Sequence, residues 1–116
     1  MKRTHEDYLR DILTATNRAL SFVAGVTLDE FLADVEKQFA VTRALEIIGE
    51  AARYIPQEIR SEYPHLPWRE MVGMRNIVIH NYFGVDETVI WRTVQEDLPI
   101  LQTAVAQVVA HLNEEK

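Results

Sequence analysis

The chain has 116 residues and a formal net charge of −6 at pH 7, and its length predicts a single domain over residues 1–116. It has no cysteine, so we expect neither disulfides nor thiolate chemistry, and we expect the protein to be cytoplasmic. No apolar run approaches the roughly 20 residues of a membrane span, and the charged N-terminus does not resemble a signal peptide, so we expect no membrane partner. The acidic balance argues against a broad basic surface for duplex DNA, while nine arginines against three lysines allow a focused phosphate site.

Apolar residues recur at spacings of three and four along the chain, which indicates helices throughout. The first helix is predicted over about Thr4 to Ala24, with Gly25 as a left-handed stop. The second is predicted to begin at a capping box, Thr27–Glu30, and to run unbroken to about Tyr54. The first half of this second helix is expected to bury five apolar side chains: Leu28, Phe31, Leu32, Val35 and Phe39.

Prolines and a glycine mark the middle of the chain. Pro56 suits the first turn of a short helix, Gln57–Glu62. Pro67 suits the start of the third long helix, Trp68 to about Phe83, and Gly84 suits its end.

Asp86 is expected to cap the last helix. An apolar seam follows in alternating steps of three and four residues and crosses Pro99 without losing phase. We therefore predict one long helix kinked near Gln95–Pro99, because proline removes a backbone hydrogen bond and crowds the preceding turn; two separate helices are the alternative. The seam contains Trp91, Val94, Leu98, Leu101, Val105, Val108 and Leu112. The predicted fold is an all-α up-and-down bundle of four long helices and one short helix.

The segment RNIVIHNY, residues 75–82, combines polar residues in an unusual way. On a helix, Arg75 and Tyr82 share one stripe, and Asn76 and His80 share the next. Arginine offers forked donors to a phosphate, histidine titrates near neutrality as a general acid or base, and asparagine can orient it or bind an oxyanion. These residue types suit phosphodiester cleavage, and the absence of a second histidine or paired carboxylates at ligand spacing argues against a metal site. A dimer with two-fold symmetry would bring the polar residues of two such segments together across one cleft and so supply two histidines.

A charged stripe on the second helix has two interpretations. Its members are Arg43, Glu46, Glu50 and Arg53. The simpler interpretation is a solvated face with ion pairs at i,i+3 and i,i+4 spacing. The other is that Glu46 or Glu50 faces the cleft and orients Arg75. Gly49 lies beside this stripe in mid-helix, where it costs about 1 kcal/mol against alanine, so we expect another backbone to approach closely there.

Residues 75–82 form an R-x4-H-x-Y motif, which resembles the HEPN superfamily and specifically its HepT-like toxin branch. The segment RALEIIGEA, residues 43–51, is similar to the family's R-x-x-E-x-x-G-E-A segment. Further blocks match in order at residues 67–70, 85–86, 89–91 and 97–99. The resemblance therefore covers most of the chain, and it implies a HEPN-type helical bundle that forms a homodimer through the motif region.

The resemblance also implies a function. HepT-like proteins are toxins of toxin–antitoxin systems, described as metal-independent endoribonucleases, so mRNA or tRNA would be the substrate and no cofactor is expected. By position, Arg75 would bind the scissile phosphate and His80 would be the acid or base for attack by the RNA 2′-OH. A MntA-like nucleotidyltransferase antitoxin would neutralise the toxin by adding AMP to Tyr82, where the new anion could pair with Arg75. The rival interpretation is a non-catalytic module that uses the same residues to bind a partner or a nucleotide.

Overall fold

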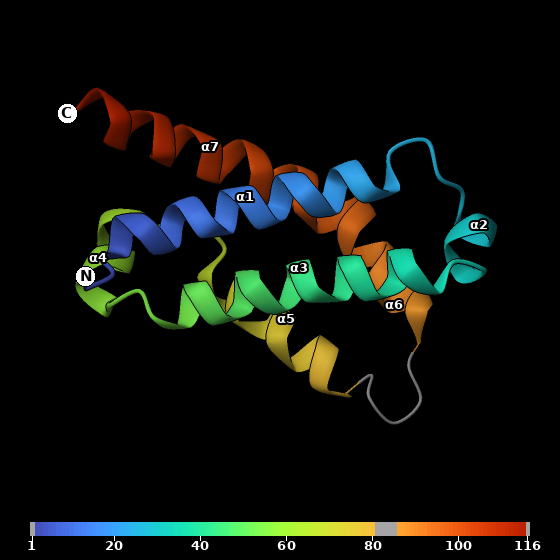
Figure 1. Cartoon of the computed structure of the whole chain (residues 1–116). Helices are drawn as coiled ribbons and strands as arrows, with labels where there is room; N and C mark the ends of the chain where they lie inside the picture. Colours follow the sequence, from blue (N-terminus) through green and yellow to red (C-terminus); the bar gives the residue numbers. More distant parts are fainter. Residues whose placement is uncertain (1, 81–85, 116) are drawn as a thin grey trace.

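The computed structural model describes residues 2–80 and 86–115, with the backbone alone at 78–80, and all regular structure in these residues is helical. The elements are α1 (His5–Val23), α2 (Leu28–Leu32), α3 (Val35–Arg53), α4 (Gln57–Glu62), α5 (Trp68–His80), α6 (Glu87–Arg92), the π-helical η2 (Thr93–Asp97) and α7 (Leu98–Glu114). Figure 1 shows α7, α1, α3 and α5 following one another across the molecule, which agrees with the contacts α7–α1, α1–α3 and α3–α5. The predicted all-α fold is therefore confirmed.

The first helix forms over the predicted range, and a capping box that was not predicted begins it. Thr4 accepts a hydrogen bond from the Asp7 backbone N–H, and the Asp7 carboxylate accepts one in return from the Thr4 backbone N–H at 2.9 Å. This capping box satisfies two N–H groups that a helix start otherwise leaves without partners. Gly25 follows the helix with a φ of +74°, the left-handed conformation that favours glycine.

The prediction of one unbroken helix from Thr27 to Tyr54 is wrong. The capping box at Thr27 forms, but α2 ends at Leu32 and the Asp34 side chain caps a new helix by accepting the Lys37 N–H at 3.1 Å. The Gln38 amide donates to the carbonyls of Phe31 and Leu32 at 2.9 and 3.1 Å, which satisfies the C-terminal end of α2. The bundle consequently has two short helices, α2 and α4, instead of one.

This break changes which side chains are buried. Phe31 is fully buried and packs against Trp91 with ring centroids 5.3 Å apart. Leu32, Val35 and Phe39, all expected in the core, are exposed, because the turn after α2 resets the helical phase and directs this side of α3 outward. The expectation of buried apolar residues was thus right for Phe31 and wrong for these three.

The last helical segment runs continuously from α6 through η2 into α7, so the predicted continuity past Pro99 is confirmed. The irregular turn, η2, overlaps the position predicted for the kink, Gln95–Pro99. The Leu98 N–H donates to the Thr93 carbonyl, a π-type bond five residues back, directly before Pro99. Proline has no N–H to offer the preceding turn, and the wider π-turn accommodates its ring. Six of the seven seam residues are buried, and Trp91 is half-buried against the core. In the described residues, no helix combines the length and apolar character needed to cross a bilayer.

Candidate functional site

The candidate site begins where α5 crosses α3. A Cβ at Gly49 would lie 2.8 Å from both the Cβ and the backbone nitrogen of Arg75, closer than real carbon atoms approach. Only glycine therefore allows α5 to lie this near to α3, as its place in the predicted helix suggested. The contact fixes the backbone of Arg75 against a buried position of α3.

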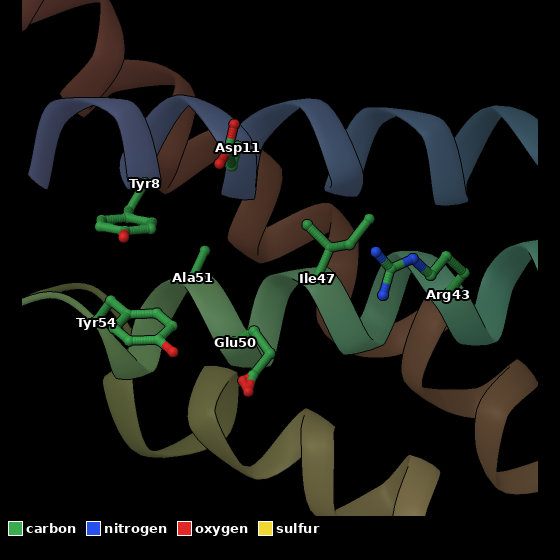
Figure 2. A pocket seen from close by; sticks show the side chains of 7 residues that line it. All are labelled: Tyr8, Asp11, Arg43, Ile47, Glu50, Ala51 and Tyr54. Atoms are coloured by element: carbon green, nitrogen blue, oxygen red, sulfur yellow. The ribbon is translucent and has the colours of Figure 1, made fainter. Parts of the chain in front are cut away.

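The Arg75 side chain meets a carboxylate of α3. Its Nε lies 3.5 Å from Glu50 Oε1, and the same oxygen lies 3.4 Å from Nη1 of Arg53. Figure 2 shows Glu50 directed away from α1 and toward α5. The other carboxylate oxygen, Oε2, is buried without a hydrogen-bond partner among the described residues. Glu50 thus holds a negative charge at the α3–α5 junction, with two guanidinium groups on one oxygen.

The structure distinguishes the two glutamates that the sequence left open. Glu46 pairs with Arg43 of its own helix at 2.5 Å, so it belongs to the solvated stripe. Glu50 is the one that lies beside Arg75. Asn76, on the adjoining side of α5, is exposed to solvent.

Two further candidate residues cannot be placed in the same way. His80 is the last residue of α5, and its side chain lies outside the described residues, as does all of Tyr82. Their proximity to Arg75 therefore stays a prediction from helical spacing. Within residues 2–80 and 86–115, the described His, Asp and Glu side chains form no cluster of three or more that could hold a metal ion.

Comparison with known proteins decides the family. The model of a family described as "Ribonuclease HepT-like" matches residues 12–108, which include α3, the Gly49–Arg75 contact and the whole R-x4-H-x-Y motif. The chain belongs to the HepT-like ribonuclease family. The resemblance inferred from residues 43–51 and 75–82 is thereby confirmed.

Two relatives illustrate the similarity to known proteins. A protein of Thermococcus cleftensis named "Probable ribonuclease HepT" is 51% identical over 102 residues, which covers 88% of this chain and 93% of that protein. A protein of Methanocaldococcus jannaschii named "Putative RNase" is 45% identical over 104 residues, covering 90% of this chain and 95% of that protein. No solved structure matches the chain.

One feature of this HepT-like chain was missed at the sequence level. Tyr8 of α1 stacks on Tyr54 at the end of α3, with ring centroids 5.3 Å apart, and the two rings close one end of a hollow of about 170 Å³ between the helices (Figure 2). The rest of its α3 side is lined by Arg43, Ile47, Glu50 and Ala51. Tyr54 carried no sequence signal beyond ending a helix, so only the packing of α1 on α3 reveals this hollow.

Proposed function

We propose that this chain is a metal-independent endoribonuclease and the toxin of a toxin–antitoxin system. The observation that carries the proposal is the placement of Arg75, whose backbone packs on Gly49 and whose Nε faces Glu50 while 39% of the side chain stays exposed. A guanidinium has five N–H donors, so one carboxylate contact through Nε leaves its Nη groups able to bind a phosphate. Membership of the HepT-like ribonuclease family supports RNA as the source of that phosphate.

The proposed reaction is an internal transfer within RNA. The 2′-oxygen bonds to the adjacent phosphorus while the bond from phosphorus to the 5′-oxygen breaks, which leaves a 2′,3′-cyclic phosphate and a 5′-OH. One His80 takes the proton of the 2′-OH, and a second His80 gives a proton to the leaving 5′-oxygen. Arg75 stabilises the negative charge that builds up on the phosphate oxygens.

Two proton transfers at one phosphate require two acid–base groups, while each chain carries a single motif histidine. A homodimer with a two-fold axis near the motif supplies the second His80 and a second Arg75. We therefore place the proposed site in a cleft shared by two copies of the chain.

The regulatory half of the proposal concerns Tyr82. On a helix it falls about 20° from Arg75, two turns on, so AMP attached to its hydroxyl would bring a phosphate to the guanidinium and occupy the site. A MntA-like nucleotidyltransferase would be the enzyme that attaches it. Intact mass after co-expression with a neighbouring nucleotidyltransferase gene should show one or more adenylyl units, and a peptide map should place them on Tyr82.

Expression of the chain alone in cells separates the enzyme from a non-catalytic binding module. We expect wild type to stop growth and degrade RNA, and His80→Ala to do neither. Purified wild type should cleave RNA equally well in the presence of EDTA, which tests the independence from metal. A harmless wild type that leaves RNA intact would favour the binding module.

A further inference from the structure

Three adjoining hollows form one groove along the line where α1 packs beside α3 (Figure 1). Arg43 lines all three, so the hollows are continuous. The first is the hollow that ends at Tyr8 and Tyr54, and the other two, of about 200 and 330 Å³, both reach Arg18. Tyr8 and Arg18 are about 15 Å apart along α1. The groove is therefore elongated, which suits a chain molecule better than a compact ligand.

The carboxylates that line this groove are balanced by arginines. Asp11 of α1 forms an ion pair with Arg3. Glu50 of α3 contacts Arg75 at 3.5 Å and a second arginine of its own helix at 3.4 Å. The groove thus has no unpaired negative charge on its described lining, although the whole chain has a formal net charge of −6. An anionic ligand is not repelled here as it would be over most of the acidic surface.

Two arginines face the groove from opposite helices. Arg18 is exposed on α1 and has no ion pair among the described residues, and Arg43 lines the same hollow from α3. The floor between them is apolar, with Ala15, Ala44 and Ile47. Guanidinium groups offer forked donors to phosphate oxygens, and an apolar floor accepts the flat faces of bases and sugars. This pairing of free cation and apolar floor points to a ligand that alternates anionic and flat apolar parts.

The other end of the groove offers an aromatic surface. Tyr54 is 60% exposed, although one face of its ring is stacked on Tyr8 with an angle of 19° between the two planes (Figure 2). Tyr8 therefore holds the Tyr54 ring in a fixed orientation and leaves its other face open. A nucleic-acid base of any sequence can stack on such a face. Stacking requires unpaired bases, so a single strand fits here and a duplex does not.

We infer that a single-stranded segment of RNA lies in this groove, with phosphates at Arg18 and Arg43 and a base on Tyr54. The inference rests on the proposed function, because it extends the RNA site beyond the bond that is cleaved. Glu50 connects the two regions, since it lines the first hollow and contacts Arg75 at 3.5 Å. An acidic protein segment could also meet the arginines, but the open aromatic face favours an alternation of bases and phosphates.

Binding of a labelled single-stranded RNA at several salt concentrations tests the contact at Arg18. His80→Ala serves as the parent protein, so that the RNA stays intact. Adding Arg18→Ala should weaken affinity about five- to tenfold at low salt and reduce the slope of log Kd against log salt by about 0.7, because one phosphate contact is lost. Arg18→Lys should restore the slope, since it keeps the charge. An affinity and a slope equal to those of the parent in Arg18→Ala would overturn the inference.

Arg10→Ala is the matched control for Arg18→Ala. Arg10 belongs to the same helix, but it faces α7, where its Nη2 donates to Asn113 Oδ1 at 3.0 Å. Its loss should change RNA affinity less than about twofold and leave the salt slope as it is in the parent. If Arg10→Ala and Arg18→Ala reduced affinity and slope equally, a general effect of net charge would replace the groove as the explanation.

The aromatic end has a different signature in the same assay. Tyr54→Ala, folded by circular dichroism, should weaken RNA affinity about fivefold without changing the salt slope, whereas Tyr54→Phe should bind like the parent. Equal affinity of these two variants would contradict a base on Tyr54. RNA held in the groove but left intact by wild type would refute only the proposed function. RNA cleaved by wild type, with equal binding in Arg18→Ala, would refute only the groove and leave it to a protein segment.

Discussion

At Gly49 the absence of one methyl group determines how closely the Arg75 backbone approaches α3. Gly49→Ala should lower the free energy of unfolding by about 1–3 kcal/mol, because its Cβ would overlap the Arg75 backbone. Gly73 is the matched control, since it is also helical but a Cβ there would meet no atom within 4 Å. Gly73→Ala should raise stability by up to about 1 kcal/mol through helix propensity. Urea unfolding checks both, and equal effects of the two substitutions would contradict the close packing.

Glu50 is proposed to position Arg75, and a substitution can distinguish this positioning from a general effect of its negative charge on RNA binding. Glu50→Gln keeps the shape but loses the ionic contact, so we expect kcat for RNA cleavage to fall about tenfold as Arg75 loses its fixed position. RNA affinity should not weaken, because a negative charge near the phosphate has been removed. Glu46→Gln, one turn away and paired with Arg43, should change kcat less than about twofold. Unchanged kcat in Glu50→Gln would remove Glu50 from the site.

Two glutamates near helix starts should respond to pH in opposite directions. Hydrogen bonding from the Thr27 backbone N–H lowers the pKa of Glu30 below its ordinary value of 4.5, so Glu30 stabilises the fold above that pH and loses its effect as the pH falls through the lowered pKa. Burial, followed by the nearby Asp86, raises the pKa of Glu87 above 4.5, so its ionisation opposes folding as the pH rises. One oxygen of Glu87 is also buried without a partner among the described residues.

As the pH rises from about 3 to about 7, the free energy of unfolding of Glu87→Gln should therefore increase relative to that of wild type. Over the same range the free energy of unfolding of Glu30→Gln should decrease relative to that of wild type. Urea midpoints measured across this range provide the comparison, and each variant is the control for the other. If the urea midpoints of both variants changed with pH in the same direction relative to wild type, the pKa values of Glu30 and Glu87 would not be shifted in opposite directions.

At the scale of the element, the break between α2 and α3 is the feature that sequence reasoning missed. The apolar residues between positions 28 and 39 fit one continuous helix. Because the Thr27 capping box already provided a helix start, the second N-cap residue, Asp34, seven residues later, was not recognised. Two side-chain bonds decide the outcome: Asp34 caps α3, and Gln38 reaches back to the end of α2. Contacts of this kind depend on geometry around the turn, which periodicity alone does not contain.

Asp34→Ala should cost about 1 kcal/mol of stability, since the Lys37 N–H loses its acceptor. Glu36→Ala, exposed in the first turn of the same helix, should change stability by less than about 0.5 kcal/mol. Thermal unfolding of both variants provides the measurement. A loss of the same size in each would mean that the cap contributes nothing specific.

At the scale of the whole molecule, the candidate site is built from two helices, α3 and α5, whose contacting residues are far apart in the sequence. The motif on α5 and the glycine on α3 could both be identified from the sequence, and so could the family. The contact of Glu50, and not Glu46, with Arg75 and the hollow beside Tyr54 could not be predicted, because each depends on how neighbouring helices pack. Spacing predicts which residues share a face, while packing decides what that face meets.

Cleavage of a labelled RNA by purified protein tests the central claim most directly. Wild type should cleave the RNA to products with 2′,3′-cyclic phosphate ends in the presence of EDTA, and Arg75→Ala and His80→Ala should each lose at least about a hundredfold in rate. Arg53→Ala is the matched control, since this arginine also contacts Glu50 but lies outside the motif, and it should retain most activity. Intact RNA after incubation with wild type, or full activity in Arg75→Ala, would contradict the proposed site.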